Sequence, residues 1–463
     1  MDSSTQLEAA IAQTVGWPRR YTIVALLALA TAICYLDRVN ISIAIIPLAR
    51  DKGYDAAATG LILSSFLWGY IGPQMLGGWL ADRFGGKRVL VVAVVLWSLG
   101  TFLTPPSAAI SFGTLLLMRS LLGLGESVHF PAAHSIAARW TIASERSRAI
   151  SLYVSGAPLG TIVALLVSPI IVPSLGWPVV FYISGVLGLL WLAIWMLKAA
   201  DDPENCLGVS AQELALIQAD RTAARRAESI PWAAILREKH VWAIVIAHLC
   251  NGFGAYIIIL WLPSYLHQTF NVPMERLGTY SIIPWIAAFC IGNISGWIAD
   301  ALCRHGMSLT AVRKLMQAAA FTLGAVPMVL LPSATSALVA TTLVTISLGG
   351  VSLGAAGYAV NHLDIAPQYA GILMGLSNTF AQLPGIVGVA LTGFIVKATQ
   401  SFAGAFYLSA FIYLIGLVCY VAMASGKRQF WVLLISGYQL RTLWIMSSIH
   451  AAHLTPAVYG LRP

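Results

Sequence analysis

The stretch from Tyr21 to Ile46 most constrains the fold, because it is apolar enough to span a bilayer yet carries Asp37 and Arg38 past its middle. A charge at the centre of a membrane helix costs roughly 2.5–3.5 kcal/mol, so such charges face a protein interior or a wet cavity. On a helix, Tyr35 shares a face with Arg38, whereas Asp37 lies on another. We interpret the two charges as a candidate site, with a structural ion pair between helices as the alternative.

Composition indicates that the whole chain belongs in a membrane. Of 463 residues, 58% are hydrophobic and only 10% are charged. A water-soluble protein of this length could not cover so much apolar surface. The net charge of +9 does not indicate nucleic-acid binding, because the basic residues lie in short loops between apolar segments. We therefore expect a protein that contacts the lipid bilayer and binds no nucleic acid.

Apolar segments of about 17–25 residues, the length that spans a bilayer, recur along the chain. Six end by Lys198 and six follow a polar gap, at residues 21–46, 56–80, 88–106, 110–134, 149–172, 177–198, 241–265, 277–300, 313–332, 336–361, 369–396 and 402–424. We predict an all-α membrane protein with twelve transmembrane helices in two six-helix halves.

These segments set the expected domain boundaries. The parts are a cytosolic N-terminus, an N-terminal bundle, a cytosolic linker, a C-terminal bundle and a tail, at residues 1–20, 21–198, 199–240, 241–425 and 426–463. Within the linker, Ser210 and Glu213 have capping-box spacing, which predicts a short amphipathic helix running to Arg226. The stretch 430–449 is partly apolar, and we favour a loose tail there over a thirteenth span.

The positions of Lys and Arg orient the chain. Loops on one side collect most of them, whereas the loops on the other side hold only Arg50, Lys52, Arg276 and Lys397. Because cytosolic loops are enriched in Lys and Arg, both termini and the linker are expected in the cytosol. The plasma or inner membrane is the favoured location, and an organelle membrane is the alternative.

Other classes of function find little support. The six cysteines form no CxxC pair and no regular spacing, so neither a disulfide framework nor a metal site is indicated, and no cofactor is expected. Intramembrane Asp, Glu and His could serve a membrane-embedded enzyme or sensor, but no HExxH, DxxD or GxSxG motif lies near them. We expect a monomeric carrier and not an enzyme.

An internal repeat relates the two halves. Gly78-Trp79-Leu80-Ala81-Asp82 matches Gly296-Trp297-Ile298-Ala299-Asp300, at an offset of 218 residues. Parallel repeats are typical of secondary transporters, which bind substrate near the midplane between the halves.

The first copy of the repeat continues as Arg83-Phe84-Gly85-Gly86-Lys87-Arg88, which completes the pattern GxxxD(R/K)xGx(R/K). In this motif the chain resembles the major facilitator superfamily. The resemblance implies a role in gating, not in substrate binding, for Gly78, Asp82, Arg83, Gly85 and Lys87.

The fourth apolar segment adds Arg119, Glu126 and His129. Arg119 and Glu126 are seven residues apart, which places them two turns apart on one helical face. Arg119 either pairs with Glu126 or Asp37, or binds substrate directly. For Glu126 a proton relay is favoured, whereas His129 is more often a satisfied interface residue.

Several stretches resemble the anion:cation symporter branch of the same superfamily, which includes sialin, the vesicular glutamate transporters, plant plastid phosphate transporters and bacterial sugar-acid symporters. They are residues 35–40, Arg119 with Glu126, 130–134, 139–140 with 144–148 and, most specifically, 361–379. Two departures, Asn251 in place of an Arg and Ser64 in place of a His, speak against glutamate as vesicular cargo.

The resemblance implies that Arg38 contacts an anionic substrate, with Arg119 in support, and that carboxylates take up the coupling proton. The candidate substrate-binding residues are Arg38, Tyr35, Arg119, Asn251, Tyr256, Ser377 and Asn378, and the candidate proton-coupling residues are Asp37, Glu126 and His129. By the repeat offset, Asp37 and Arg38 correspond to Ala255 and Tyr256, so the second half contributes shape and neutral hydrogen bonds. Core packing is an equal alternative for Tyr256.

We predict a secondary active transporter that moves a small organic anion, such as a sugar acid, a sialate-like anion or another carboxylate, together with protons by alternating access. Na⁺-dependent transport of inorganic phosphate is the alternative. The sequence leaves open the identity of the anion, the choice between H⁺ and Na⁺, and the direction of transport.

Overall fold

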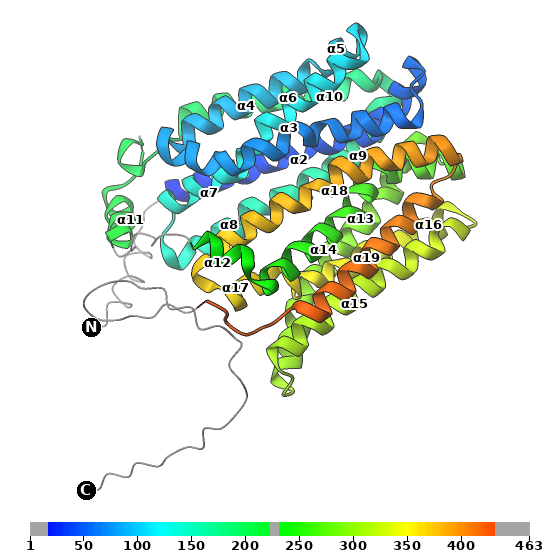
Figure 1. The fold of residues 1–463 in the computed structure, drawn as a ribbon. Coiled ribbons are helices and arrows are strands. Elements are labelled where there is room, and N and C mark those ends of the chain that lie inside the picture. Colours follow the sequence, from blue (N-terminus) through cyan, green and yellow to red (C-terminus); the bar gives the residue numbers. More distant parts are fainter. Residues whose placement is uncertain (1–16, 207, 223–230, 431–463) are drawn as a thin grey trace, which may run out of the picture.

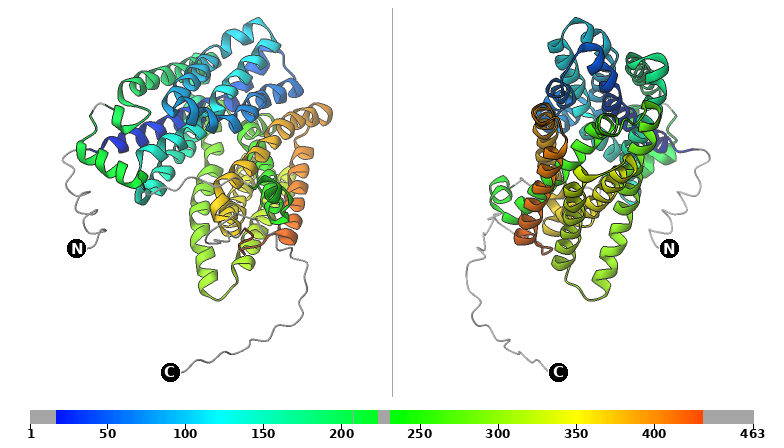
Figure 2. Two further views of the ribbon diagram at one scale, coloured as in Figure 1. Left: turned by 60° about the vertical axis from the view of Figure 1, so that its left-hand side comes forward. Right: turned by 90° about the vertical axis from the view of Figure 1, so that its right-hand side faces the viewer.

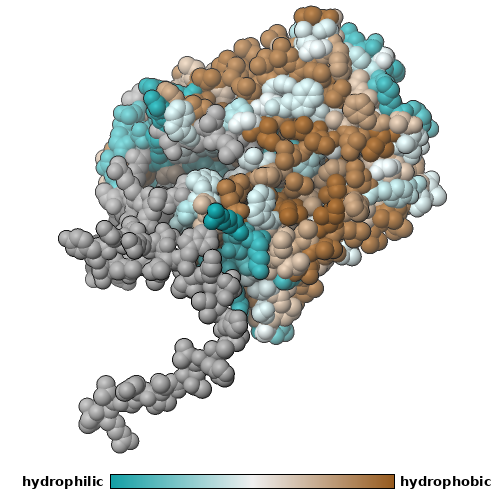
Figure 3. All heavy atoms as spheres, in the orientation of Figure 1, coloured by the Kyte–Doolittle hydropathy of each residue, from teal (hydrophilic) through white to brown (hydrophobic). Residues whose placement is uncertain are grey.

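The computed structural model describes residues 17–206, 208–222 and 231–430, and this part of the chain is helical without a strand. Nine of its helices are long and apolar enough to cross a membrane, or ten if α4 and α5 count as one bent span. Apolar side chains cover most of the visible face, with hydrophilic residues towards its ends (Figure 3). The chain is therefore an all-α membrane protein, as the sequence predicts.

The helices of the two halves follow the order of the predicted segments (Figure 1). In the first half they are α2 (Arg19–Lys52), α3 (Ala56–Phe84), α4 (Gly86–Phe102), α5 (Thr104–Ile110), α6 (Phe112–Ser127), α7 (His129–Trp140), α8 (Ala143–Val154), α9 (Gly156–Leu175) and α10 (Trp177–Lys198). In the second half they are α13 (Lys239–Phe270), α14 (Met274–Arg304), α15 (Leu309–Leu330), α16 (Ala337–Val351), α17 (Tyr358–Ile365), α18 (Ala370–Thr399) and α19 (Ala403–Met423). The tail after residue 430 lies outside the described residues.

Several expected segments are broken helices. The segment expected over 88–106 continues as α5 to Ile110, bent by 50° at Leu103. Prolines in the first turn of α5 account for the break, because proline lacks the N–H that would continue the helix of α4. The segment expected over 110–134 is likewise divided at Val128 and extends to Trp140.

The linker helix α11 (Ala211–Thr222) docks on the start of α2. Ser210 accepts the backbone N–H of Glu213 at 3.1 Å, the contact expected of a capping box. The Glu213 carboxylate does not turn back to its own helix, because it accepts the backbone N–H groups of Arg19 and Arg20 at 3.0 and 2.9 Å. Since the first N–H groups of a helix lack partners within it, Glu213 caps α2 from the linker. The part of this helix expected over residues 223–226 lies outside the described residues.

A second carboxylate ties α8 to the same end of α2. Glu145 accepts Arg20 Nε at 2.8 Å and the Tyr21 hydroxyl at 2.7 Å. Burial disfavours the ionised carboxyl, but the hydrogen bonds from Arg20 and Tyr21 outweigh it and hold the pKa of Glu145 below its usual value. Glu145 therefore stays ionised and holds α2 at neutral pH.

The two halves touch at one end and part at the other. Figure 2 shows the two groups of helices inclined to each other. Near the end predicted to face away from the cytosol, a Cβ on Gly393 of α18 would meet the Ala56 carbonyl oxygen of α3 at 2.3 Å, so only glycine fits. Towards the other end of the same helices, a Cβ on Gly72 or Gly375 would meet nothing within 4 Å. The space between the halves therefore opens towards the predicted cytosolic side.

Candidate functional site

A small pocket lies between the halves, lined by α2, α3 and α6 on one side and α13 on the other. Its lining residues are Arg38, Leu63, Phe66, Leu67, Arg119, Tyr256, Ile259 and Leu260. Two guanidinium groups thus face a wall that is otherwise aliphatic and aromatic. The guanidinium groups would attract an anionic group, and the wall would contact an apolar part of the same ligand.

Arg38 of α2 is held by a carboxylate and three aromatic rings. Its Nη2 lies 3.0 Å from Glu126 Oε2, and Glu126 is fully buried. Its Cζ lies 4.6 Å from the ring centre of Tyr35, 4.8 Å from that of Phe66 and 4.7 Å from that of Tyr70. Contacts of this kind contribute about 0.5–2 kcal/mol each and fix the plane of the guanidinium. Arg38 Nε has no hydrogen-bond partner among the residues that the structure describes, so this atom is available to a ligand.

Arg119 of α6 is buried without an anion. Only 1% of this side chain is exposed, and its Nε and Nη1 atoms have no hydrogen-bond partner in the described structure. The salt bridge to Glu126 or Asp37 that the sequence allows is not formed, since Glu126 pairs with Arg38. An unpartnered buried charge costs several kcal/mol, so Arg119 is poised for an anionic ligand.

Asp37 does not pair with its neighbour Arg38. Adjacent residues on a helix point in different directions, and Arg38 finds its carboxylate on α6 instead. Asp37 is fully buried, and neither carboxylate oxygen has a hydrogen-bond partner in the part of the chain that the structure describes. Asn40, one turn along the same face, bonds to Ser184 at 2.6 Å and accepts Ser168 at 2.9 Å. Asp37 therefore lies in a polar interior, with both oxygens available to a proton or cation.

The contacts of His129 do not include the Glu126 carboxylate. His129 Nε2 lies 2.8 Å from Thr31 Oγ1, and its ring packs edge-on against Trp97. Because the Thr31 hydroxyl donates to the Leu27 carbonyl, Nε2 of His129 is the donor and the neutral ring is satisfied there. This environment matches an interface histidine more closely than a proton relay.

The second half presents neutral groups to the pocket. The Tyr256 hydroxyl donates to Gln382 Oε1 of α18. Gln382 Nε2 lies 3.5 Å from Asn378 Oδ1, one turn earlier on the same helix. Asn251, two helical turns from the pocket residue Ile259, is half-buried, and its Oδ1 atom has no hydrogen-bond partner in residues 17–206, 208–222 and 231–430. Sequence reasoning did not select Gln382, although its spacing of four from Asn378 on one helical face was visible.

Ser377 is not brought to the pocket. Its Oγ lies 3.1 Å from His248 Nδ1 and 2.9 Å from His362 Nε2. The predicted role of Ser377 in lining the substrate site therefore has no contact that supports it.

The predicted gating residues surround the turn between α3 and α4. They are Gly78, Asp82, Arg83, Gly85 and Lys87, and the side chain of Asp82 lies outside the described part. Gly85 has φ +91°, a left-handed value that favours glycine, and a Cβ there would meet the Asp201 carboxylate at 2.5 Å. The Lys87 N–H donates to Asp201 at 2.7 Å, while Arg83 lies over the Trp79 ring at 5.3 Å. The turn is thus bound to the beginning of the linker.

Comparison with known proteins places this architecture in a family. Residues 27–389 match the Major Facilitator Superfamily. The fold also resembles a bacterial homolog of the human lysosomal transporter Spinster, with TM-score 0.67, 18% identity and coverage of 89% of this chain and 96% of that one.

Curated relatives cover most of the chain at higher identity. "Probable anion transporter 4, chloroplastic" of Oryza sativa subsp. japonica is 40% identical over 89% of this chain and 70% of its own length. Two Arabidopsis thaliana proteins each match 89% of this chain: "Sodium-dependent phosphate transport protein 1, chloroplastic" is 39% identical over 80% of its length, and "Ascorbate transporter, chloroplastic" 38% over 76%. The chain is a transporter and not an enzyme, and it belongs to the major facilitator superfamily.

Proposed function

We propose that the protein moves a small organic anion together with protons by alternating access. Arg119 carries this proposal, because it is a buried guanidinium at the edge of a pocket between the two halves, and its Nε and Nη1 atoms have no acceptor within the described part of the chain. Arg38 faces the same pocket, and two guanidinium groups suit a carboxylate. The aliphatic wall suits a carbon skeleton, and one relative is named as an ascorbate transporter.

Glu126 links anion binding to the proton. Its carboxylate holds Arg38 at 3.0 Å, so a bound anion competes with Glu126 for the same guanidinium. Protonation of Glu126 removes that competition, which makes the proton and the anion bind cooperatively. Asp37 is a second buried carboxylate near this group and supplies a further place for a proton.

The arrangement of the halves supports a state that is open to the cytosol. At the opposite end, Asp55 before α3 pairs with Lys397 of α18 at 2.9 Å. Gly60 and Gly393 also pack closely there, with 3.1 Å from a Cβ on Gly60 to the Gly393 Cα. To open that end, the carrier separates these contacts and closes the space beside Gly72 and Gly375.

Sodium-coupled phosphate transport is the second candidate. One relative is named as a sodium-dependent phosphate transport protein, and Asp37 has two buried oxygens without a hydrogen-bond partner in the described residues. Such a carboxylate could take Na⁺ in place of a proton, and the two guanidinium groups would bind phosphate as readily as a carboxylate.

The names of the relatives also favour a plastid membrane over the plasma membrane that the sequence suggested. The three plant relatives named above are all described as chloroplastic. We therefore propose the plastid envelope as the location of this carrier. A fluorescent fusion imaged with envelope and plasma-membrane markers tests this, and a signal confined to the plasma membrane would contradict it.

Reconstitution of the full chain into liposomes tests the activity. Ascorbate, an aldonate, a hexuronate, sialate, glutamate and phosphate are offered singly, under a proton gradient alone or a sodium gradient alone. We expect an organic anion to accumulate under the proton gradient, and Arg119→Gln to abolish it while the exposed control Arg304→Gln retains it. Accumulation of phosphate only, under sodium only, would favour the second candidate. No accumulation of any of these anions by the wild type would contradict both.

A further inference from the structure

Three side chains from separate helices meet in the C-terminal half, away from the pocket. His248 comes from α13, Ser377 from α18 and His362 from α17. The Ser377 Oγ atom lies 3.1 Å from His248 Nδ1 and 2.9 Å from His362 Nε2. His362 Nδ1 lies 2.8 Å from the carbonyl oxygen of Ala359. Ser377 and His362 are buried, whereas His248 is half-buried.

These contacts constrain the direction of the hydrogen bonds. A carbonyl only accepts, so His362 carries a hydrogen on Nδ1, and in the neutral ring Nε2 is an acceptor. The single hydrogen of the Ser377 hydroxyl is shared between Nε2 of His362 and the Met374 carbonyl oxygen, which lies 3.1 Å away, and the Ser377 oxygen accepts the Nδ1–H of His248. Nε2 of His248 is left as a lone pair without a hydrogen bond among the described residues.

A proton that arrives at Nε2 of His248 can pass through this chain with every heavy atom in place. The Nδ1 hydrogen of His248 moves to Ser377 Oγ, and the Ser377 hydrogen moves to Nε2 of His362. His362 then carries the charge, while His248 is neutral with its hydrogen on Nε2. Both contacts to Ser377 persist with donor and acceptor exchanged, so one proton is bound and none is lost.

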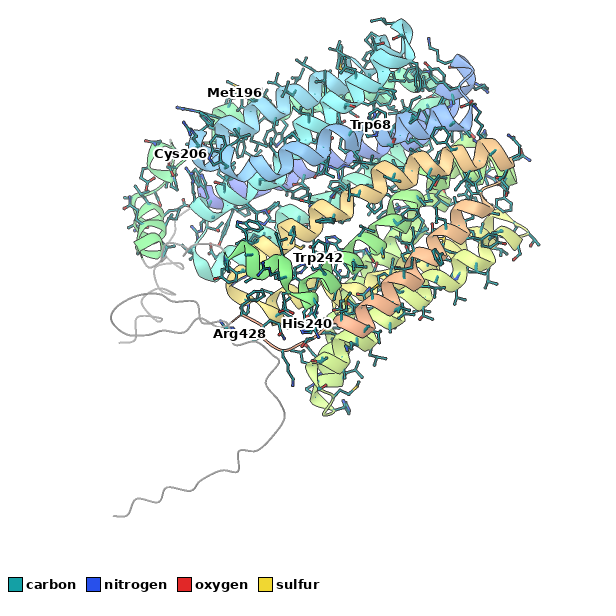
Figure 4. All side chains as sticks on the ribbon, viewed as in Figure 1. Trp68, Met196, Cys206, His240, Trp242 and Arg428 are labelled. Carbon is teal, nitrogen blue, oxygen red and sulfur yellow. The ribbon has the colours of Figure 1, made fainter. Side chains whose placement is uncertain are left out.

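The histidine pair lies at a different depth from the pocket. His248 precedes the pocket residue Tyr256 by eight positions on α13, which is about 12 Å along a helix. Ser377 precedes Gly385, which packs against Tyr256, by the same spacing on α18. Figure 4 labels His240 and Trp242 at the start of α13, the end predicted to face the cytosol. The pair therefore lies about two helical turns from the pocket, towards the end of α13 that is predicted to face the cytosol.

The groups around the two histidines are neutral or already paired. From α17, the Tyr358 ring lies 4.9 Å from the His248 ring, and from α19 the Tyr420 hydroxyl is bonded to the Asn361 amide at 3.0 Å. Charged side chains nearby are Asp364 of α17 and Arg313 of α15, which pair with each other at 2.7 Å. The charge that each histidine faces most directly is therefore that of the other. A second proton on the pair would be repelled by the first.

We propose that His248, Ser377 and His362 form a proton-binding site of the C-terminal half, which takes up one proton from the cytosolic side and is separate from the Arg38–Glu126 group. The site gives the carrier a dependence on cytosolic pH that does not pass through the substrate pocket. It is built from His248 of α13 together with His362 and Ser377 of the stretch 361–379.

Nuclear magnetic resonance of ¹⁵N-histidine-labelled protein in nanodiscs tests the site without any substrate. Of the nine histidines, we expect two to titrate as one coupled step as the pH falls from about 8 to about 4. Ser377→Ala should uncouple them, and His248→Gln should leave His362 with a simple titration. Glu126→Gln should leave the coupled step in place, so failure of the proposed transport mechanism would not affect this result. Two independent titrations in the wild type, or no change in Ser377→Ala, would overturn the proposal.

Substrate exchange at equal pH on both membrane faces tests the consequence for transport. We expect His362→Gln to lose a rate change of about threefold or more between pH 5 and 8. His267→Gln is the control, because His267 lies on α13, the helix of His248, and bonds a backbone carbonyl at 2.9 Å. An unaltered pH profile in His362→Gln would mean that the pair does not exchange protons during the cycle.

Discussion

The two halves of the carrier present opposite chemistry to the space between them. The N-terminal half contributes two guanidinium groups and a buried carboxylate, from Arg38, Arg119 and Glu126. The C-terminal half contributes aliphatic side chains and one hydrogen-bonded phenol, that of Tyr256. Under the proposed function, the charge of the substrate would be recognised by the N-terminal half alone, whereas both halves would contact its apolar part.

The repeat offset makes this difference specific. Arg38 and Tyr256 are related by 218 residues, and both line the same pocket. Positions that correspond by this offset thus carry a charge in one half and a neutral donor in the other. A substrate held by such a pair is bound firmly to the N-terminal half and loosely to the C-terminal half. Movement of the halves can then change its access without breaking its ionic contacts.

The largest effect is expected from Arg38→Lys. An ammonium group keeps the charge, but it cannot hold Glu126 and an anion with a planar fork, nor lie flat among three rings. We expect anion uptake to fall by about tenfold or more, measured as initial rate in proteoliposomes. The exposed Arg50→Lys serves as control. Near-normal affinity in Arg38→Lys would assign Arg38 to structure alone.

Glu126→Gln separates coupling from binding. The amide cannot carry the coupling proton and no longer opposes an anion at Arg38, so gradient-driven accumulation should stop while substrate exchange continues. Accumulation and counterflow measured on the same vesicles check this, with the exposed Glu275→Gln as control. If Glu126→Gln still accumulates substrate under a pH gradient, the coupling proton binds elsewhere.

Asp37→Asn should have a smaller effect that sharpens the assignment of the proton. Asp37 has no direct contact with Arg38, so its charge acts on the anion at longer range than that of Glu126. We expect the mutant to bind the anion, with a weaker decline of affinity as pH rises than in the wild type. Calorimetric binding between about pH 5 and 8 measures this decline. A wild-type decline in Asp37→Asn would leave Glu126 as the sole coupling carboxylate.

Changes in the C-terminal half should cost less. Gln382→Ala removes the acceptor of the Tyr256 hydroxyl, and a neutral hydrogen bond contributes about 0.5–1.5 kcal/mol. We expect KM for the anion to rise by a few fold with the maximal rate nearly kept, and Tyr256→Phe to do the same. An effect as large as that of Arg38→Lys would show that this half also reads charge.

The sequence predicted the membrane fold because insertion cost dictates it. Long apolar segments that carry few charges have no stable place in water, and the rare charges within them mark the interior. Tyr35, Arg38, Arg119 and Glu126 were found in this way, and the structure brings them together. Helix breaks were harder to predict. The helix is interrupted at Val128, three residues before Pro131, and the spacing of apolar residues does not indicate a break at this position.

What the sequence could not supply is which partners meet across helices. Arg38 follows Asp37 in the chain, yet its carboxylate is Glu126, 88 residues away. Ser377 was predicted to line the substrate site with Asn378, whereas in the structure its hydroxyl contacts two histidines. Charged side chains in a membrane helix must face the protein interior because of their insertion cost, but neutral side chains are not constrained in this way. The directions of Ser377 and Gln382 are therefore set by packing, which the sequence does not show.

The smallest effect concerns the end at which the two halves touch. Asp55 accepts the Ala58 N–H at 2.8 Å as the cap of α3 and pairs with Lys397 at 2.9 Å. The backbone hydrogen bond first, and then Lys397, lower the pKa of Asp55. A lowered pKa means that its contribution to stability is complete above the unfolded pKa of about 3.9 and is lost as pH falls through the lower, folded value. Both partners are exposed, so the pair itself contributes less than about 1 kcal/mol.

Asp55→Asn keeps an acceptor for the cap but removes the pair, whereas Asp55→Ala removes both. We expect Asp55→Asn and Lys397→Gln to lower the Tm by similar small amounts, not additively, and only at low salt, because salt screens exposed pairs. Asp55→Ala should cost about 1 kcal/mol more, since the cap is also lost. Thermal unfolding of the three variants and the double mutant at two ionic strengths measures these differences. If the carrier alternates access as proposed, opening this end separates the pair, so its loss should also raise the outward-open fraction slightly. An additive, salt-independent change in Tm would show that Asp55 acts through the cap alone.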